Sequence, residues 1–199
     1  GVDISFFDQV NLTFDYFYDH RDRILMKRAS FPSLLGYGGY VPWSNIGEVI
    51  NKGVEISLNW NKQFGKNWFV DFRGNFTFNR NKYEYADEPD YPYVWQTKTG
   101  KPLNTLTGYL ADGLFSSQEE IDNWADQSQL GGNNLRPGDI KYRDINGDGQ
   151  ITEQDQVMLS PYADIPNIQY GFGLNLTYKK FDFGVFFNGS AKRKIMINE

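Results

Sequence analysis

Oxygen-bearing side chains are closely spaced between residues 144 and 155. Their order follows D-x-[DN]-x-[DN]-G with a carboxylate at the twelfth position, which is the spacing of a calcium-binding loop. Calcium takes roughly six to eight oxygen ligands, which such a loop supplies from its first, third, fifth, seventh, ninth and twelfth positions. Those positions are held by Asp144, Asn146, Asp148, Gln150, Thr152 and Asp155.

The pattern therefore predicts a Ca²⁺ site with a structural rather than a signalling role. The first three residues would supply side-chain oxygens, Gln150 a backbone carbonyl, and Thr152 a hydroxyl or a bound water. Asp155 reaches less far than the usual glutamate, which weakens bidentate binding. The alternative is an Asn-Gly-Asp-Gly surface turn whose carboxylates are solvated.

Aromatic side chains occur in two segments that proline and glycine mark as loops, around residues 29–43 and 86–95. They are candidates for stacking on sugar rings or for contacting a partner protein. The alternative is that they pack within the loops or form an aromatic girdle at a membrane surface. The candidates are Tyr37, Tyr40, Trp43, Tyr91, Tyr93 and Trp95.

The composition excludes several classes of function. The chain has no cysteine and a single histidine, His20, so thiolate chemistry and histidine metal clusters are not available. It contains no nucleophile elbow, phosphate loop or dinucleotide fingerprint, and no convincing pair of catalytic carboxylates. We therefore predict that it is not an enzyme. A net charge of −5 argues against nucleic acid as a partner.

Four stretches alternate apolar and polar residues with a period of two, at 12–19, 54–61, 71–79 and 168–179. Side chains alternate between the two faces of a strand, so each stretch has one apolar and one polar face. Aromatic residues are frequent, with 16 Phe, 13 Tyr and 5 Trp. Long strands of this kind are typical of a transmembrane β-barrel, which is apolar toward lipid and polar toward its lumen.

The expected fold is all-β, with antiparallel up-and-down strands of a transmembrane β-barrel. We expect strands at 2–7, 10–28, 46–61, 68–85, 165–178 and 181–197, with a bulge or bend at the Asn-Lys-Gly sequence 51–53. Short turns alternate with long connections, as in barrels with tight periplasmic turns and long extracellular loops. The longest connection, 86–164, should contain a short helix over 118–124 capped by Ser116 or Ser117.

Several motifs resemble the SusC/RagA-like TonB-dependent transporters of the Gram-negative outer membrane. They are Asn-Ile-Gly-Glu-Val at 45–49, Asn-Lys-Gly-Val-Glu-Ile at 51–56 and Gly-Asp-Ile-Lys-Tyr-Arg-Asp-Ile-Asn-Gly-Asp-Gly at 138–149. Residues 160–166, 170–172 and 178–183 are also similar. The resemblance implies that 1–199 is a partial barrel domain, about six strands of a larger plugged barrel, near but not at its carboxyl end. Residues 86–164 would then be a long extracellular loop insertion.

The resemblance also implies a function. Such a barrel imports oligosaccharides or peptides together with a SusD-like surface lipoprotein, and it contacts TonB through segments outside this sequence. The location would be the outer membrane, with lipid around the barrel. An alternative from another class is a soluble β-rich carbohydrate-binding module stabilised by calcium. Strand length separates the two, because membrane-spanning strands need roughly 9–11 residues, and 12–28 and 165–178 are longer.

Overall fold

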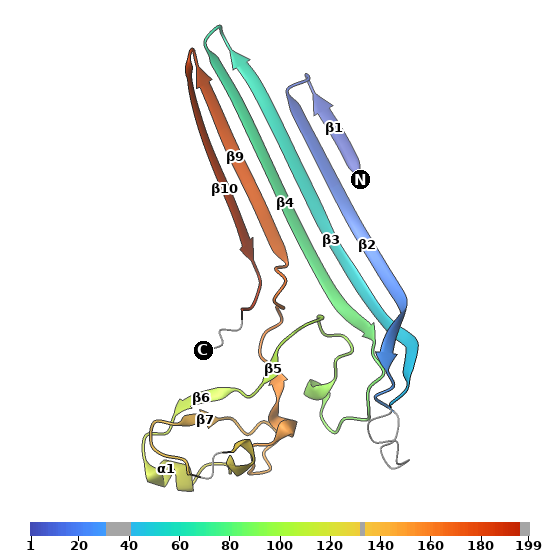
Figure 1. Ribbon diagram of the computed structural model, residues 1–199, viewed down its shortest axis with the longest axis vertical. Helices are drawn as coiled ribbons and strands as arrows, with labels where there is room; N and C mark the ends of the chain where they lie inside the picture. The colour runs from blue at the N-terminus through green and yellow to red at the C-terminus, as the bar shows by residue number, and fades with distance from the viewer. Residues whose placement is uncertain (31–40, 132–133, 196–199) are drawn as a thin grey trace.

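The computed structural model describes residues 1–30, 41–131 and 134–195. Its main element is a six-stranded antiparallel sheet in the order β1-β2-β3-β4-β9-β10 (Figure 1). The strands are β1 (Val2–Phe6), β2 (Val10–Lys27), β3 (Trp43–Phe64), β4 (Trp68–Tyr85), β9 (Ile168–Tyr178) and β10 (Phe181–Ala191). The all-β, antiparallel, up-and-down arrangement predicted from the alternation is confirmed.

The connections alternate in length as predicted. Tight turns join β1 to β2, β3 to β4 and β9 to β10 at one end of the sheet, and the long connections lie at the other end (Figure 1). Two of the tight turns contain non-glycine residues with positive φ, namely Asp8 (54°) and Lys179 (56°), and the third contains Gly65 (61°). Positive φ angles suit the right-handed twist of a hairpin.

The register sorts the side chains into two faces, because residues that face each other across strands point the same way. One row across the sheet consists of Val10, Trp60, Phe72, Leu174 and Val185. We call the side of the sheet that carries this row the apolar face.

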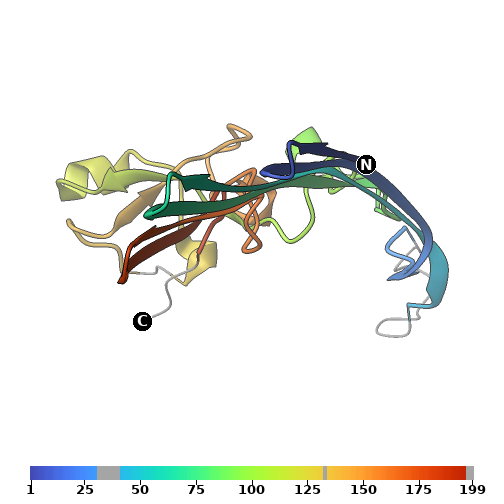
Figure 2. The ribbon, with the colours of Figure 1, turned by 90° about the horizontal axis from the view of Figure 1, so that it is seen from above.

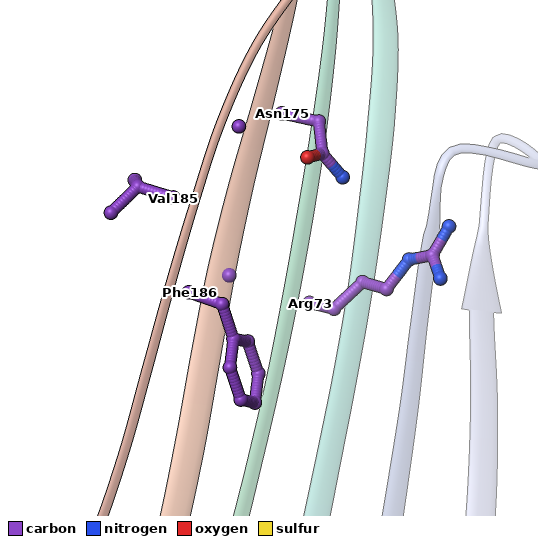
Figure 3. A pocket seen from close by; sticks show the side chains of 6 residues that line it. Arg73, Asn175, Val185 and Phe186 are labelled. Atoms are coloured by element: carbon purple, nitrogen blue, oxygen red, sulfur yellow. The ribbon is translucent and has the colours of Figure 1, made fainter.

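The next row along the strands belongs to the opposite side, which we call the polar face. It consists of Asn11, Asn59, Arg73, Gly173 and Phe186. In Figure 3, Val185 points away from the side where Arg73 and Asn175 project, as this alternation requires. The Phe186 ring lies over the adjacent glycines, and a Cβ atom added at Gly173 would be 3.1 Å from this ring. A shallow hollow of about 310 Å³ remains beside it on the polar face.

No second layer covers the apolar face within the described ranges. Phe14, Phe172 and Phe183 on this face are 41%, 42% and 61% exposed. The sheet is curved and open, and β1 and β10 form its two edges (Figure 2). An uncovered apolar surface with two unpaired edges is what a section of a larger barrel presents, and it is unlike a self-contained soluble module.

Several strand boundaries differ from the sequence-based prediction. The strand expected at 46–61 is three residues longer at each end, since β3 runs from Trp43 to Phe64. The first residue of β9 is Ile168 rather than Ile165, since Pro166 has no N–H to donate to a strand ladder. The last residue of β10 is Ala191, because Lys192 takes a φ of +55° that ends the extended conformation. Residues 196 and 197 of the predicted strand lie outside the described residues.

The predicted bulge at Gly53 is wrong. The pairing of β3 with both neighbours runs without a shift through this residue, and the register shifts lie at Glu48/Val49 and after Arg21. A Cβ on Gly53 would lie 2.6 Å from the Phe17 ring and 2.1 Å from the Phe78 carbonyl oxygen. Glycine is therefore needed for close approach rather than for a bend.

In the ranges that the structure covers, no helix has both the length and the apolar character needed to cross a membrane.

Candidate functional site

The described residues of the connection between β4 and β9 form a folded unit at the end of the sheet away from the tight turns (Figure 1). Two small antiparallel sheets organise it, and each joins segments far apart in the sequence. They pair β5 (Thr107–Gly108) with β8 (Val157–Met158), and β6 (Ala111–Leu114) with β7 (Ile140–Tyr142). Short contacts between distant segments therefore give the connection a defined shape.

The predicted helix is present as α1 (Gln118–Asp122). The Ser117 hydroxyl accepts the Glu120 N–H at 3.2 Å, which identifies the cap. The Glu120 carboxylate accepts hydrogen bonds from Lys141 Nζ on β7 at 2.6 Å and from the backbone and hydroxyl of Ser116. These bonds, with Lys141 contributing most, lower the pKa of Glu120 to about 2. The carboxylate thus fastens α1 to β7.

A small core holds the connection together. Ile151 and Asp155 are fully buried, and Gln127 is 3% exposed. The Gln127 side chain donates to the Ile140 carbonyl at 3.1 Å and accepts the Tyr142 N–H at 2.7 Å. It therefore satisfies backbone groups of β7 that have no strand partner there.

The loop 144–155 has the compact turn that its spacing predicts. The two carboxylate oxygens of Asp144 accept the N–H groups of Gly147 and Gly149 at 2.7 and 2.8 Å. Both glycines have positive φ, at 76° and 84°, where other residues are strained. Asp148 in turn accepts the Gln150 N–H at 2.8 Å. The first, third and fifth positions thus lie on one tight turn.

Asp155 has a different environment from the other predicted ligands. Its carboxylate is buried and accepts three backbone N–H groups, from Ile145 at 2.8 Å, Asn146 at 3.3 Å and Thr152 at 2.8 Å. With Thr152 it forms a capping box on the short 3₁₀ helix Glu153–Asp155. The residue therefore ties the start of the loop to its end through hydrogen bonds.

The loop offers the hard oxygen donors that calcium prefers. A carboxylate has about four lone-pair sites, so Asp144 and Asp155 keep acceptor capacity beyond the N–H groups they bind. Among the residues that the structure describes, no group of three or more His, Cys, Asp or Glu is arranged to hold a metal ion. The calcium site stays a prediction.

Trp95 connects the candidate aromatic residues at 91–95 to the loop 144–155. The Tyr93 and Trp95 rings stack with centroids 4.5 Å apart and planes 7° apart. The Trp95 indole N–H donates to the Gln154 carbonyl at 2.8 Å. Trp95 and Tyr91 line a cavity of about 520 Å³, whose wall also includes Glu153. The structure therefore brings together two features that lie about sixty positions apart in the chain.

The same cavity contains polar residues that sequence reasoning missed. Lys101 donates from Nζ to the Trp95 carbonyl. Burial lowers the pKa of this lysine, and the nearby Glu88 carboxylate opposes the shift. The Gln96 Oε1 atom is buried without a hydrogen-bond partner in the described part of the chain. No sequence motif marks these residues, since the cavity forms only when residues 83–107 and 153–156 pack together.

The remaining aromatic candidates lie elsewhere. Trp43 was predicted in a loop but is the first residue of β3, where it pairs with Lys27. The Lys27 ammonium lies 5.6 Å from the centre of the Trp43 ring. Trp43 therefore does not contribute to the cavity. Tyr37 and Tyr40 lie outside the described residues.

Comparison with known proteins places these features in a family. Residues 1–194 match the family described as TonB dependent receptor-like, beta-barrel. TonB-dependent receptor P3 of Formosa agariphila is 26% identical over 209 residues, covering 98% of this chain and 20% of that protein. TonB-dependent receptor SusC of Bacteroides thetaiotaomicron is 28% identical over 147 residues, covering 70% of this chain and 14% of that protein.

Solved structures show the same fold. The RagAB peptide importer in the open-open state superimposes with a TM-score of 0.65 at 16% identity, covering 94% of this chain and 19% of that chain. The RagAB peptide transporter gives a TM-score of 0.60 at 15% identity. The chain spans about a fifth of the length of the curated relatives it matches.

Proposed function

The chain belongs to the TonB dependent receptor-like β-barrel family, and on that premise we propose that it forms part of the wall of a nutrient importer in a Gram-negative outer membrane. The observation that carries the proposal is the two-faced sheet, whose apolar face is uncovered in the described residues. Closing such a sheet with further strands satisfies its edges, and a closed barrel is one of the two ways to cross lipid without unpaired backbone groups.

In this arrangement the apolar face meets lipid and the polar face lines the passage. The tight turns lie on the periplasmic side, and the connection between β4 and β9 lies outside the cell. External connections of a barrel are where ligands and partner proteins first make contact. The ordered connection is therefore the part of this chain best suited to recognition.

We propose that the imported nutrient is an oligosaccharide or a peptide and that a SusD-like surface lipoprotein assists its capture. Energy coupling to TonB would use segments outside this sequence. The cavity beside Trp95 supports this proposal, since it combines aromatic rings with polar groups from Gln96 and Lys101. Aromatic faces with a few convergent polar groups are typical of sites that bind small ligands.

A growth experiment tests the import function. Deleting the gene for the full-length receptor should abolish growth on one class of nutrient when a panel of oligosaccharides and peptides is supplied, and the intact gene should restore it. Trp95→Ala should restore growth poorly although the barrel still assembles. The matched control is Val94→Ala, because Val94 is 84% exposed and adjacent. Normal growth of the deletion strain on every nutrient would contradict the proposal.

We also propose that Ca²⁺ binds the loop 144–155 and stabilises the connection. The ligand spacing and the oxygen donors of Asp144 and Asp148 support this. Calcium added to the chelator-treated, full-length receptor should slow proteolysis near Gly147 while leaving the barrel unaffected. Asp148→Asn should weaken that protection, whereas Asp164→Asn, an exposed change outside the loop, should not. Equal proteolysis with and without calcium would count against the site.

A further inference from the structure

The apolar face changes character toward the long-connection end of the sheet. Beyond Val54 on β3 and Phe78 on β4, the next side chains on this face are Lys52, Arg80 and Lys82. Residues two positions apart on a strand project to the same side. Three cations therefore follow directly after the apolar rows, and we call them the outer basic cluster.

Two cations of the outer basic cluster oppose each other. Lys52 and Arg80 are register partners on adjacent strands, and like charges directly opposite are destabilising. Within the described residues neither forms an ion pair. The repulsion is relieved if an anion lies between them.

The nearby carboxylates already have partners. Glu84 accepts from Lys82 at 2.6 Å, and Glu48 lies 3.5 Å from the His20 Nε2 atom. The charge of Lys82 is thus partly neutralised by Glu84 on the same strand. The positive charge that remains for an external anion is that of Lys52 and Arg80.

The outer basic cluster lines a cavity of about 140 Å³. Its other wall is the segment 100–102, which lies along the end of β4 through two backbone hydrogen bonds. These run from the Gly100 N–H to the Tyr83 carbonyl at 2.8 Å and from the Tyr83 N–H to the Lys101 carbonyl at 2.9 Å. The hollow is therefore built by both strands and by the connection, on a scale suited to a phosphate group rather than to a whole nutrient.

The position of the cavity along the sheet suggests the source of the anion. Tyr18 is the register partner of Lys52 on β2 and is 57% exposed, and Tyr16, 59% exposed, precedes it on the same face. Tyrosine rings on a lipid-facing surface mark the level of the headgroups. Lysine and arginine at that level bind anionic lipid headgroups.

We propose that the outer basic cluster binds the phosphate-bearing headgroup of a lipid in the leaflet on the side of the long connections. The proposal rests on the membrane location given under Proposed function. A bound headgroup would hold β3, β4 and the segment 100–102 together at the membrane surface. This would make the outer end of the barrel sensitive to the lipids around it.

Native mass spectrometry of the detergent-purified, full-length receptor tests the proposal, with phosphatidic acid and phosphatidylcholine as probes. The wild-type receptor should retain phosphatidic acid preferentially. The double variant K52Q/R80Q should bind it about fivefold more weakly for each cation removed. The matched control is K62Q/K179Q at the tight-turn end, where each lysine lies 5.2 Å from an aromatic ring centre. The control should keep the preference, and equal losses in both variants would overturn a specific site.

A second variant separates lipid binding from folding. Lys52→Glu places an opposite charge across from Arg80, so the variant should be at least as resistant to heat as the wild type and should still lose the preference for phosphatidic acid. Retention of the preference by this variant would overturn the proposal. Inorganic phosphate should not displace the lipid. Displacement by phosphate alone would assign the site to free phosphate and overturn the lipid site.

Failure of the lipid site can be distinguished from failure of the import function. A receptor that fractionates with the outer membrane and restores growth, yet binds both lipids equally, would overturn the lipid site alone. A receptor that stays in buffer without detergent would overturn both proposals.

Discussion

Asp155 shows how one side chain can serve a loop in two ways. Its spacing from Asp144 suits a calcium ligand, and its buried carboxylate accepts three backbone N–H groups. Replacing a buried carboxylate of this kind is destabilising, because each backbone N–H left without an acceptor is desolvated and gains no hydrogen bond in return. Its contribution to the loop therefore does not depend on a bound ion.

Asp155→Asn should loosen the connection whether or not calcium is present. The amide replaces one acceptor oxygen with an N–H₂ group that faces backbone N–H donors, at a cost of about 1–3 kcal/mol. Limited proteolysis of the full-length receptor measures this loosening. Asp164→Asn is the matched control, because Asp164 is exposed, lies outside the loop and accepts a single backbone N–H, from Ile165. Loosening of Asp155→Asn only after chelation would refute the capping role.

Glu120 makes the connection sensitive to acid. Its folded-state pKa of about 2 lies below the ordinary value of 4.5, so its stabilising contribution is present above pH 4.5 and is lost as the pH falls toward 2. Hydrogen exchange of the segment around α1 should therefore show less protection as the pH falls through this window.

Two variants check the assignment to Glu120. Glu120→Gln removes the charge that Lys141 binds, so protection should be lower at neutral pH and should change little on acidification. Glu119→Gln changes the neighbouring residue of the same helix and should leave the wild-type profile intact. An unchanged acid transition in Glu120→Gln would show that another group is responsible.

At the scale of elements, the alternation of apolar and polar residues predicted the features of the sheet that depend on the direction of the side chains. It gave the two faces of each strand, because a one-residue slip in register would move every side chain to the wrong face. The order of short and long connections followed from where the alternating stretches begin and end. The alternation misjudged Gly53, because the need for glycine there arises from Phe17 on a neighbouring strand. The first residue of β9 also depends on Pro166, whose effect on pairing the alternation did not show.

The connection was predictable only in its local motifs. The cap of α1 and the turns of the loop 144–155 follow from short spacings. The cavity does not, because it depends on contacts such as the hydrogen bond from Trp95 to Gln154, between residues far apart in the sequence. Buried Gln127 likewise has no signal of its own, although the Thr152-x-x-Asp155 spacing of the capping box was readable.

Gly53→Ala should destabilise the sheet. The added methyl would lie 2.1 Å from the Phe78 carbonyl oxygen and 2.6 Å from the Phe17 ring, and overpacking of this kind costs about 1–3 kcal/mol. The control is Gly74→Ala on β4, where the nearest atom would be 3.3 Å away. Urea unfolding of the full-length receptor in detergent should give a lower midpoint for Gly53→Ala than for Gly74→Ala. Equal midpoints would contradict a close approach at Gly53.

At the scale of the molecule, the described residues form little interior of their own. The fully buried side chains Ile151 and Asp155 belong to the connection, whereas large apolar side chains of the sheet are exposed. A soluble protein of this design would carry an aggregation-prone surface. In the proposed membrane location, lipid would cover this surface and further strands of a barrel would pair with the two sheet edges.

A paired arginine substitution at the middle of β9 tests this account most directly. Leu174 lies on the apolar face in the row with Trp60 and Phe72, and the next residue, Asn175, lies on the polar face. Leu174→Arg should destabilise the membrane-embedded, full-length receptor by about 2–4 kcal/mol in urea unfolding from bilayers, because the charge enters hydrocarbon. Asn175→Arg should change the stability far less. Equal effects, or a larger effect at Asn175, would contradict the assignment of the apolar face to lipid.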